Sequence, residues 1–513
     1  MSVNEPFSLG IRNFAGRLLK GWSFQVKILF VSSEVVPFSK TGGLADVAGA
    51  LPPALRRLGH DVRIVTPRYR ITSEERFGIR PILHDIRVHF QSESHVTQIR
   101  TAPLPGTDIP VYFVNYEPYF DRANLYTEAG KDYPDNPQRF ALFCMSALWM
   151  LRALDWKPDV IHCNDWQTGL IPTYLMHHPD LKFDEFYKGI RVLYTIHNLA
   201  YQGRFPREIL NSLGLGWEVY TMHGLEFYGD INLMKAGIVF SDEITTVSKT
   251  YAREIQTDEY GCGLDGVLRT RSVHLTGILN GIDYTVWNPE TDPLIPAKFG
   301  PGKMAGKAKC KKALQAKCGL PEKPEVPMIG VISRLADQKG FDLIAAIAQD
   351  LFQMDIQMVL LGTGEPKYHE IFQKIGKKHP DKASIHLTFD NQLAHEIEAG
   401  CDMFLMPSSY EPCGLNQLYS LKYGTLPIVR KTGGLADSIT DATSETIKDG
   451  SGTGFVFEEY SPKALFETIG RAVNLFSKAA TWRKIRENGM AKDFSWDASA
   501  RMYEGLYRRM ITG

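Results

Sequence analysis

Lys40-Thr-Gly-Gly-Leu-Ala-Asp46, or KTGGLAD in one-letter code, recurs letter for letter at Lys431–Asp437. The first copy follows the apolar run KILFVSSEV, the second follows LPIVR, and a helical pattern comes after each copy. An identical heptapeptide in the same strand-to-helix context indicates duplication of a βα unit. The chain is therefore expected to contain two α/β halves built on one plan.

Short β-branched runs alternate with helical stretches throughout both halves, which is typical of parallel sheets covered by helices on both faces. We expect an α/β fold with two Rossmann-like, doubly wound domains that bind ligands in the cleft between them. The strands predicted for the first half are Val26–Ser32, Val62–Pro67, Val111–Asn115, Val160–Cys163, Val192–Ile196 and Ile244–Val247. Those predicted for the second half are Met328–Ser333, Gln357–Leu361, Ser384–Leu387, Met403–Pro407 and Pro427–Arg430.

The length of the chain also favours two domains, since 513 residues exceed what one ordinary hydrophobic core supports. The segment Asn288–Pro327 is rich in Pro, Lys and Gly, and is interpreted as a connecting region with a short helix near Lys307–Lys317. The hinge is placed close to Gly281. The predicted N-terminal domain therefore spans residues 1–280, and the C-terminal domain begins at residue 281.

The composition excludes several classes of protein. Lys and Arg together number 58, as do Asp and Glu, and this neutral balance argues against a nucleic-acid-binding protein. Seven scattered cysteines without a C-x-x-C pair argue against a zinc ribbon or a disulfide framework, and favour the reducing cytoplasm. No apolar run reaches the roughly 18 residues that span a bilayer. The basic amphipathic stretch Phe7–Trp22 is interpreted as a surface extension, with a plastid transit peptide as the alternative.

Two sequence patterns bear on cofactors. The run from Gly261 to Gly266 matches the dinucleotide pattern G-x-G-x-x-G, but the charged stretch YAREIQTDEY before it is helical rather than a strand, so a nicotinamide cofactor is not expected. No D-x-D occurs in the chain, and paired acids of this kind commonly hold a divalent metal in glycosyltransferases. We therefore expect no metal and no cofactor.

Cationic side chains follow strands in both halves. Lys40 precedes Gly42 and Gly43 at a helix start, where free backbone N–H groups and a positive charge suit a diphosphate, although such a turn alone is more often structural. Arg334 ends a predicted strand and Lys339 begins the next helix. Two cations on one βα loop can grip both phosphates of a sugar nucleotide and stabilise charge as the bond breaks.

Three further features surround this phosphate-binding loop. Glu411 is followed by Pro-Cys-Gly414 at a helix start, and its carboxylate suits sugar hydroxyls or a positive anomeric carbon. Gly364 in LGTGE supplies a flexible turn after a strand. Phe389, at the end of HLTF, supplies an aromatic wall for a nucleotide base.

The first half offers a separate polar cluster after its own strands. Asp165 in IHCNDW and His197 in YTIHNLAYQG both lie at predicted strand ends, where α/β active sites form. A lone histidine at such a place is usually a packing residue. Planar polar groups and an aromatic face beside it nevertheless make a carbohydrate site credible. The residues expected to share this surface are Asn198, Tyr201, Gln202, Tyr126 and Arg139.

Taken together, these motifs closely resemble the family of bacterial glycogen synthase and plant starch synthase, from Lys27 to the C-terminus. The resemblance is carried by KTGGLADVAGALP, NDWQTGL, HNLAYQG, LNGID, SRLADQKG and EPCGLNQLYSLKYG. It implies the GT-B architecture, retention of configuration and independence of metal. It also implies a final helix, at about Phe494–Met510, that returns to the N-terminal domain, so the C-terminal domain ends at 493 and residues 494–513 stand apart.

The resemblance assigns roles position by position. It implies that Lys40 binds ADP-glucose, that Asp165 and His197 line the glucose pocket, and that Arg334 and Lys339 bind the diphosphate. Glu411 and Cys413 match the EPCG site, and Asn280 matches a residue of the cleft. With Glu411, the Asp165, His197, Arg334 and Lys339 side chains form the expected catalytic set. The expected substrate-binding set takes in further members of these motifs, namely Asp46, Gln338, Gly414 and Leu415.

The function expected from the resemblance is transfer of glucose from ADP-glucose to the non-reducing end of an α-1,4-glucan such as glycogen. Three alternatives stay open from the residues. They are a transferase of the same architecture that uses UDP-glucose, an inactive glucan-binding scaffold, and a phosphorylase, which would need a pyridoxal-phosphate lysine and a longer chain. The sequence leaves the oligomeric state and the preferred acceptor length open.

Overall fold

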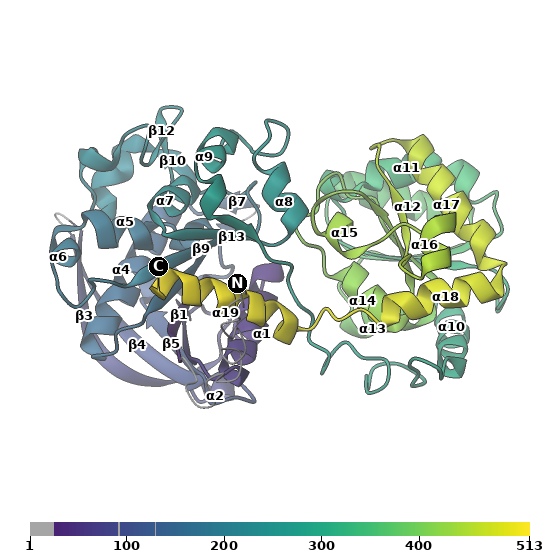
Figure 1. Ribbon diagram of the computed structural model, residues 1–513, viewed down its shortest axis with the longest axis horizontal. Coiled ribbons are helices and arrows are strands. Elements are labelled where there is room, and N and C mark those ends of the chain that lie inside the picture. Colours follow the sequence, from purple (N-terminus) through teal and green to yellow (C-terminus); the bar gives the residue numbers. More distant parts are fainter. Residues whose placement is uncertain (1–24, 91–92, 129, 513) are drawn as a thin grey trace, which may run out of the picture.

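The computed structural model describes residues 25–90, 93–128 and 130–512. It has two lobes, each built on one sheet (Figure 1). The stretch Phe7–Trp22, interpreted as a surface extension, lies outside the described residues. The N-terminal lobe contains a nine-stranded sheet, in the order β14 (Leu275–Gly277), β13 (Glu243–Thr246), β9 (Arg191–Ile196), β8 (Val160–Asn164), β1 (Lys27–Val31), β2 (Asp61–Pro67), β5 (Pro110–Asn115), β4 (Glu93–Pro103) and β3 (Arg80–Phe90).

The C-terminal lobe contains a six-stranded sheet in which every pair of neighbours is parallel. Its strands run in the order β17 (Ala383–His386), β16 (Gln357–Leu361), β15 (Met328–Ile332), β18 (Met403–Met406), β19 (Leu426–Arg430) and β20 (Phe455–Phe457). The order reverses between β15 and β18, which is the kind of switch point where α/β sheets bind ligands. All eleven strands predicted from the sequence are confirmed to within two residues.

The first sheet departs from the all-parallel prediction at one edge. β3 pairs antiparallel with β4, and β4 pairs antiparallel with β5. Exposed and buried side chains alternate near the end of β3, because one face of this hairpin lies in water. The period-two pattern is weaker than the continuous apolar runs of the buried parallel strands, and the hairpin was therefore missed.

Helices cover the sheets of both lobes (Figure 1). Those of the N-terminal lobe are α1 (Gly43–Arg57), α2 (Glu74–Phe77), α3 (Glu117–Phe120), α4 (Asn136–Ala153), α5 (Leu170–His177), α6 (Pro179–Lys182), α7 (Leu233–Phe240), α8 (Lys249–Glu254) and α9 (Asp265–Thr270). Those that follow are α10 (Ala305–Lys317), α11 (Phe341–Leu351), α12 (Pro366–Lys378), α13 (Asn391–Gly400), α14 (Asn416–Tyr423), α15 (Gly433–Ser438), α16 (Ser444–Asp449), α17 (Pro462–Phe476), α18 (Ala479–Met490) and α19 (Trp496–Thr512).

Both copies of KTGGLAD link a strand to a helix, as the repeat predicts. The first joins β1 to α1, although the chain makes a short excursion before Lys40, and the second joins β19 directly to α15. The two helices differ in length, with 15 residues in α1 and six in α15. The duplicated turns therefore serve different surroundings, which the contacts described below make explicit.

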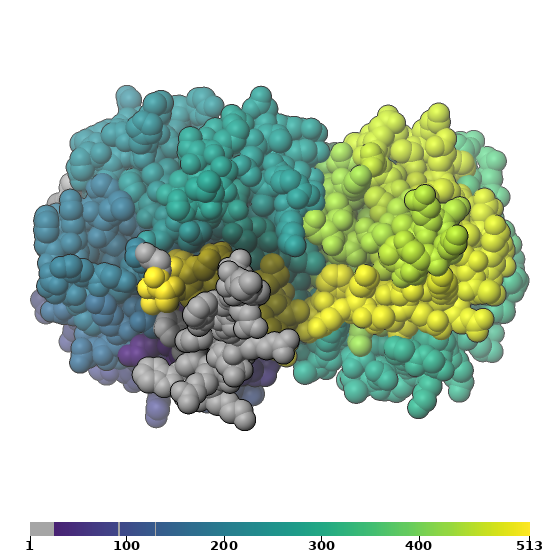
Figure 2. Space-filling model, viewed as in Figure 1, coloured from purple at the N-terminus to yellow at the C-terminus, as the bar shows by residue number. Residues whose placement is uncertain are grey.

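The last helix crosses back to the N-terminal lobe, as Figures 1 and 2 show in yellow. Tyr507 of α19 shares a hydrogen bond of 2.7 Å between its hydroxyl and His162 Nδ1 in β8. Asp497 binds Arg57 at the end of α1, and Ser499 donates to the carbonyl of Leu279. The apolar face of α19 packs into the core beside β1 and β2. The C-terminus is thus part of the N-terminal lobe.

The described part of the chain includes no helix that is both long enough and apolar enough to cross a bilayer. A three-stranded sheet, in the order β10 (Arg204–Pro206), β12 (Asp230–Asn232) and β11 (Glu226–Phe227), projects from the N-terminal lobe beside α9 (Figure 1). A hairpin of β6 (Thr127–Glu128) and β7 (Lys131–Asp132) completes the list of strands.

Candidate active site

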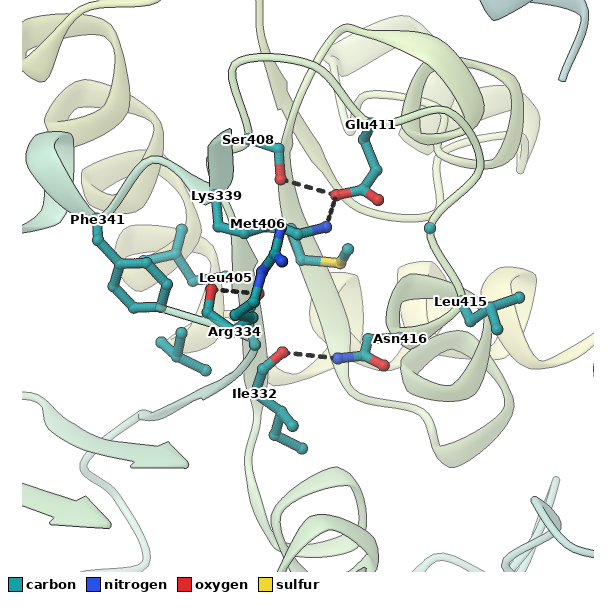
Figure 3. Close-up of a pocket in the computed structure, with 13 residues that line it drawn as sticks. Ile332, Arg334, Lys339, Phe341, Leu405, Met406, Ser408, Glu411, Leu415 and Asn416 are labelled. Carbon is teal, nitrogen blue, oxygen red and sulfur yellow. Dashed lines mark hydrogen bonds and ion pairs between the residues drawn. The ribbon is translucent and has the colours of Figure 1, made fainter. Parts of the chain in front are cut away.

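A cavity of about 200 Å³ lies at the carboxyl ends of β15 and β18 (Figure 3). The Lys339 ammonium lies 2.7 Å from Glu411 Oε2, and the hydroxyl of Ser408 donates to the same oxygen at 2.9 Å. Glu411 is buried, whereas Arg334 is exposed. The structure thus brings together three members of the predicted catalytic set, Arg334, Lys339 and Glu411, around one cavity.

The two cations of this cavity are not equivalent. The charge of Lys339 is balanced by Glu411, and such a pairing is what allows a carboxylate to be buried. Within the described ranges, Arg334 has no carboxylate in ion-pair distance, and its contact is the hydroxyl of Tyr201 at 3.4 Å from Nη2. Arg334 therefore carries the free positive charge with which the site can meet an anionic ligand.

Backbone geometry explains the glycine and amide that follow Glu411. Gly414 has a φ of +69°, and a Cβ there would lie 2.5 Å from the side-chain oxygen of Gln417. Asn416 donates through Nδ2 to the carbonyl of Ile332 at 2.7 Å, which ties the start of α14 to the end of β15 (Figure 3). Ser408 and Asn416 were not among the residues predicted for the site, although Asn416 stands within the motif EPCGLN.

Asp165 and His197 lie together in the N-terminal lobe. Asp165 follows β8 with a φ of +56°, a left-handed conformation that is strained for a residue with a side chain, and such strain concentrates at functional sites. Its Oδ1 accepts the backbone N–H of His197 at 2.8 Å. Desolvation raises the pKa of Asp165 to about 7, although the N–H groups of His197 and Asn198 oppose the shift. Asp165 therefore titrates closer to neutral pH than a carboxyl group in water does.

His197 is neutral, because burial lowers the pKa of its imidazole to about 3. The amide nitrogen of Asn164 donates to the carbonyls of Val31 and His162, so the amide oxygen is left to face His197 Nε2 at 2.8 Å. His197 Nε2 must then carry the proton, and Nδ1 is left as an acceptor. Such an imidazole can accept a hydrogen bond from a sugar hydroxyl but is poorly suited to act as a cation.

The remaining side chains predicted for the surface of the first half make different kinds of contact. The hydroxyl of Tyr126 meets Ser33 Oγ at 2.8 Å, and Gln202 donates to the carbonyl of Cys262 at 3.0 Å. The assignment of Arg139 to this surface was wrong. Arg139 is fully buried, and its guanidinium donates to the carbonyls of Tyr119 and Leu125, so it holds the segment before α4 in place.

The first KTGGLAD turn is bound by a carboxylate of its own lobe that the sequence did not reveal. Glu34, buried just after β1, accepts the N–H of Thr41, the hydroxyl of Thr41 at 3.0 Å and the N–H of Gly42 at 3.3 Å. Lys40 pairs with Asp46 at 2.7 Å. An added Cβ on Gly42 or Gly43 would meet nothing within 4 Å, so the outer side of the turn is open.

The second turn binds a carboxylate from the opposite lobe. Glu254 of α8 accepts the N–H of Gly433 at 3.1 Å and the hydroxyl of Thr432 at 3.0 Å. In return, Asp437 of α15 accepts the N–H of Thr250 at 2.9 Å and its hydroxyl at 2.6 Å. Each helix start is thus satisfied by an acid from the other lobe, and we name this exchange between α8 and α15 the interlobe joint.

Other predicted residues are distributed around these two centres. Cys413 packs with the apolar core of the N-terminal lobe, and Leu415 lies against the same core. Asn280 is buried. Gln338 donates to the carbonyl of Tyr410 at 3.2 Å, and Gly364 donates its N–H to His369 Nε2 at 3.0 Å. Phe389 is exposed. Ligand contacts of these residues stay predictions.

A metal site would require several ligating side chains close together. Across residues 25–90, 93–128 and 130–512, no three His, Cys, Asp or Glu side chains gather closely enough to hold a metal ion. The charged groups that line the cavity at the end of β15 are instead two cations, Arg334 and Lys339, and one carboxylate, Glu411. A metal-free mechanism stays a prediction for experiment.

Known proteins match this chain along nearly its whole length. A family model described as the starch synthase catalytic domain matches residues 27–270, and one described as glycosyl transferases group 1 matches residues 313–489. A glycogen synthase of Anaeromyxobacter dehalogenans is 49% identical over 486 residues, which cover 94% of this chain and 100% of that protein.

The chain belongs to the glycogen synthase family. Glycogen synthase 1 of Methylococcus capsulatus is 48% identical over 495 residues, covering 95% of this chain and 97% of that protein. Among solved structures, the catalytic domain of starch synthase IV from Arabidopsis thaliana, bound to ADP and acarbose, superimposes with a TM-score of 0.86 at 34% identity, covering 95% of this chain and 100% of that one. The GT-B fold and hexosyltransferase activity expected of the glycogen synthase family are thereby confirmed.

A more distant structure shares the fold alone. Sucrose-phosphate synthase from Thermosynechococcus elongatus superimposes with a TM-score of 0.57 at 16% identity, and it covers 94% of this chain and 98% of that one. The architecture alone does not identify the reaction. The assignment of the reaction therefore depends on the motifs that distinguish the glycogen synthase family.

The interlobe joint leads to a first prediction. We expect Glu254→Ala to leave the start of α15 without its acceptor and so to loosen the contact between the lobes. The radius of gyration in solution should then increase, and kcat should fall severalfold. Lys431→Ala is the matched control, because Lys431 belongs to the same heptapeptide but pairs with exposed Glu458 of its own lobe. Small-angle scattering with activity assays on both variants tests this. An unchanged scattering profile in Glu254→Ala would count against the joint.

Proposed function

We propose that the chain transfers glucose from ADP-glucose to the non-reducing end of an α-1,4-glucan, with retention of configuration and without a metal. The observation that carries this proposal is the contact of Arg334 with Tyr201, which joins the cationic cavity of one lobe to the loop that follows His197 in the other. A diphosphate on Arg334 would thus have its sugar beside the neutral imidazole and Asp165. The ADP bound to the related starch synthase IV supports the choice of nucleotide.

In the proposed reaction, the bond between C1 and the diphosphate oxygen breaks first. Arg334 and Lys339 stabilise the charge that develops on the leaving diphosphate, and Glu411 holds Lys339 in position. The acceptor 4-hydroxyl then attacks C1 from the same face, so that its proton passes to the departing oxygen. His197 Nδ1 accepts a hydrogen bond from the sugar and keeps it in place, which is an orienting role rather than nucleophilic attack.

One assay separates this proposal from its alternatives. The protein is incubated with glycogen and with radiolabelled ADP-glucose, UDP-glucose or glucose 1-phosphate, in the presence and absence of EDTA. We expect incorporation to be greatest from ADP-glucose and unaffected by EDTA, because arginine and lysine side chains do the work of a metal. Incorporation mainly from UDP-glucose, or only from glucose 1-phosphate, would refute the donor assignment, and loss of activity in EDTA would refute metal independence.

A further inference from the structure

The hairpin of β11 and β12 carries an unusual residue at its tip. Phe227 pairs with Asp230, so the connection has two residues, Tyr228 and Gly229, with φ of +52° and +87°. Two consecutive positive φ values are the mark of a type I′ turn, which favours Asn or Asp at the first position because a larger side chain is strained there. Tyrosine at this position costs stability that asparagine would not.

Packing contacts of Tyr228 do not compensate for this backbone strain. Tyr228 is 74% exposed, and its ring approaches Phe227 edge to face, with ring centroids 4.8 Å apart. A residue kept in an unfavourable backbone conformation, with a large apolar surface in water, is better explained by a ligand than by the fold.

The surrounding residues fix the turn firmly. Gly229 donates its N–H to Glu226 Oε1 at 3.0 Å, and its carbonyl accepts the hydroxyl of Tyr220 at 2.9 Å. Below them, the buried ammonium of Lys235 donates to the carbonyls of Met222, at 2.8 Å, and Glu226. The Tyr228 ring is therefore presented from a rigid support, which lowers the entropy lost when it binds a partner.

The tip lies on a chain of contacts that ends at the cationic cavity. Phe227 and Tyr228 face Gly263, where an added Cβ would lie 3.1 Å and 3.4 Å from the two rings. The side-chain amide of Gln202 donates to the carbonyl of the neighbouring Cys262. The side-chain oxygen of Gln202 in turn accepts a hydrogen bond from the amide of Asn232 in β12 at 2.6 Å. Tyr201, next to Gln202, contacts Arg334. The hairpin tip thus borders the loops that frame the site.

We propose that Tyr228 is a stacking platform for the α-1,4-glucan acceptor, on the N-terminal lobe outside the reacting centre. The inference rests on the proposed function for the identity of the polymer. A pyranose ring has an apolar face that stacks on an aromatic ring, while the phenol hydroxyl at the ring edge remains free to bind sugar hydroxyls. A platform beyond the reacting sugar would bind longer chains better than short ones without touching the nucleotide.

Tyr228→Asn tests the proposal, because a structural role and a glucan-binding role of Tyr228 predict opposite results. Asparagine suits a type I′ turn, so we expect the melting temperature to stay the same or rise. The KM for glycogen and maltoheptaose is expected to rise about three- to tenfold, whereas the KM for the sugar nucleotide stays within about twofold of wild type, as the loss of one stacking contact of about 1 kcal/mol implies. Tyr228→Phe keeps the ring and is expected to retain most glucan affinity.

Phe183→Asn is the matched control, since Phe183 is 79% exposed and follows directly after α6. Figure 1 shows α6 at the outer edge of the same lobe. Retardation in native gels containing glycogen, without any sugar nucleotide, should fall in Tyr228→Asn and not in Phe183→Asn. Unchanged retardation and glucan KM in Tyr228→Asn overturn the proposal, whatever happens to stability. Because the gels contain no donor, a failure of the ADP-glucose assignment would leave their result intact and is recognised separately.

Discussion

Replacement of Arg334 by alanine is expected to lower kcat by about 10²- to 10³-fold, the usual effect of removing one group that stabilises developing negative charge. The midpoint of thermal unfolding should change little, because Arg334 is exposed and its contact with Tyr201 is long, at 3.4 Å. Steady-state kinetics with ADP-glucose and glycogen, together with calorimetry, measure the two effects separately.

Lys339→Ala provides the contrast to this prediction. It should lower kcat as well, but it also leaves the buried Glu411 carboxylate with Ser408 and no cation. The loss should cost about 1–3 kcal/mol of stability, because Lys339 is only partly buried. Lys431→Ala, which removes an exposed lysine from the second heptapeptide, is the neutral control. Normal kcat in Arg334→Ala would remove Arg334 from the reaction and with it the diphosphate-binding role of the cavity.

Asp165→Asn is expected to produce the second large loss, a decrease in kcat of about 10²-fold, which is within the range for groups that position or exchange protons. The amide keeps the shape of the side chain and can still accept the N–H of His197, so the strained turn should fold. What disappears is the carboxyl group whose pKa is raised to about 7. The pH profile of kcat near neutrality should therefore flatten in the variant.

The same substitution changes how stability depends on pH. The folded state holds the Asp165 proton more tightly than the unfolded chain does, so this group stabilises the fold at low pH and loses that contribution as pH rises towards about 7. Urea titrations between pH 5 and pH 8 should show a shallower fall in stability for Asp165→Asn than for wild type. Identical slopes would mean that Asp165 is ionised throughout this range.

The fold was predictable because its signals are local. Buried parallel strands read as short apolar runs, and the repeated KTGGLAD identified the two βα units without any knowledge of packing. The β3–β4 hairpin was not predicted, because about half of its side chains face water. Edge strands of this kind are specified by their alternation and by a neighbour, which one sequence window does not contain.

The candidate site was predictable only in part, for a related reason. Arg334, Lys339 and Glu411 stand in recognisable motifs, so their meeting at one cavity could be anticipated. Glu254 stands in no motif, and its partner Gly433 lies far along the chain, so nothing local marks it. Arg139 was misassigned because a cation in a polar segment resembles a ligand-binding group, whereas carbonyl groups of the fold surround it.

The exchange of acids between α8 and α15 has a consequence for how such proteins can be recombined. Each lobe, taken by itself, would present a helix start whose backbone amides have lost their partner, together with an acid that has lost its helix. A chimaera that joins this N-terminal half to another protein's C-terminal half would therefore have to inherit Glu254 and the Thr432–Asp437 segment as a matched set.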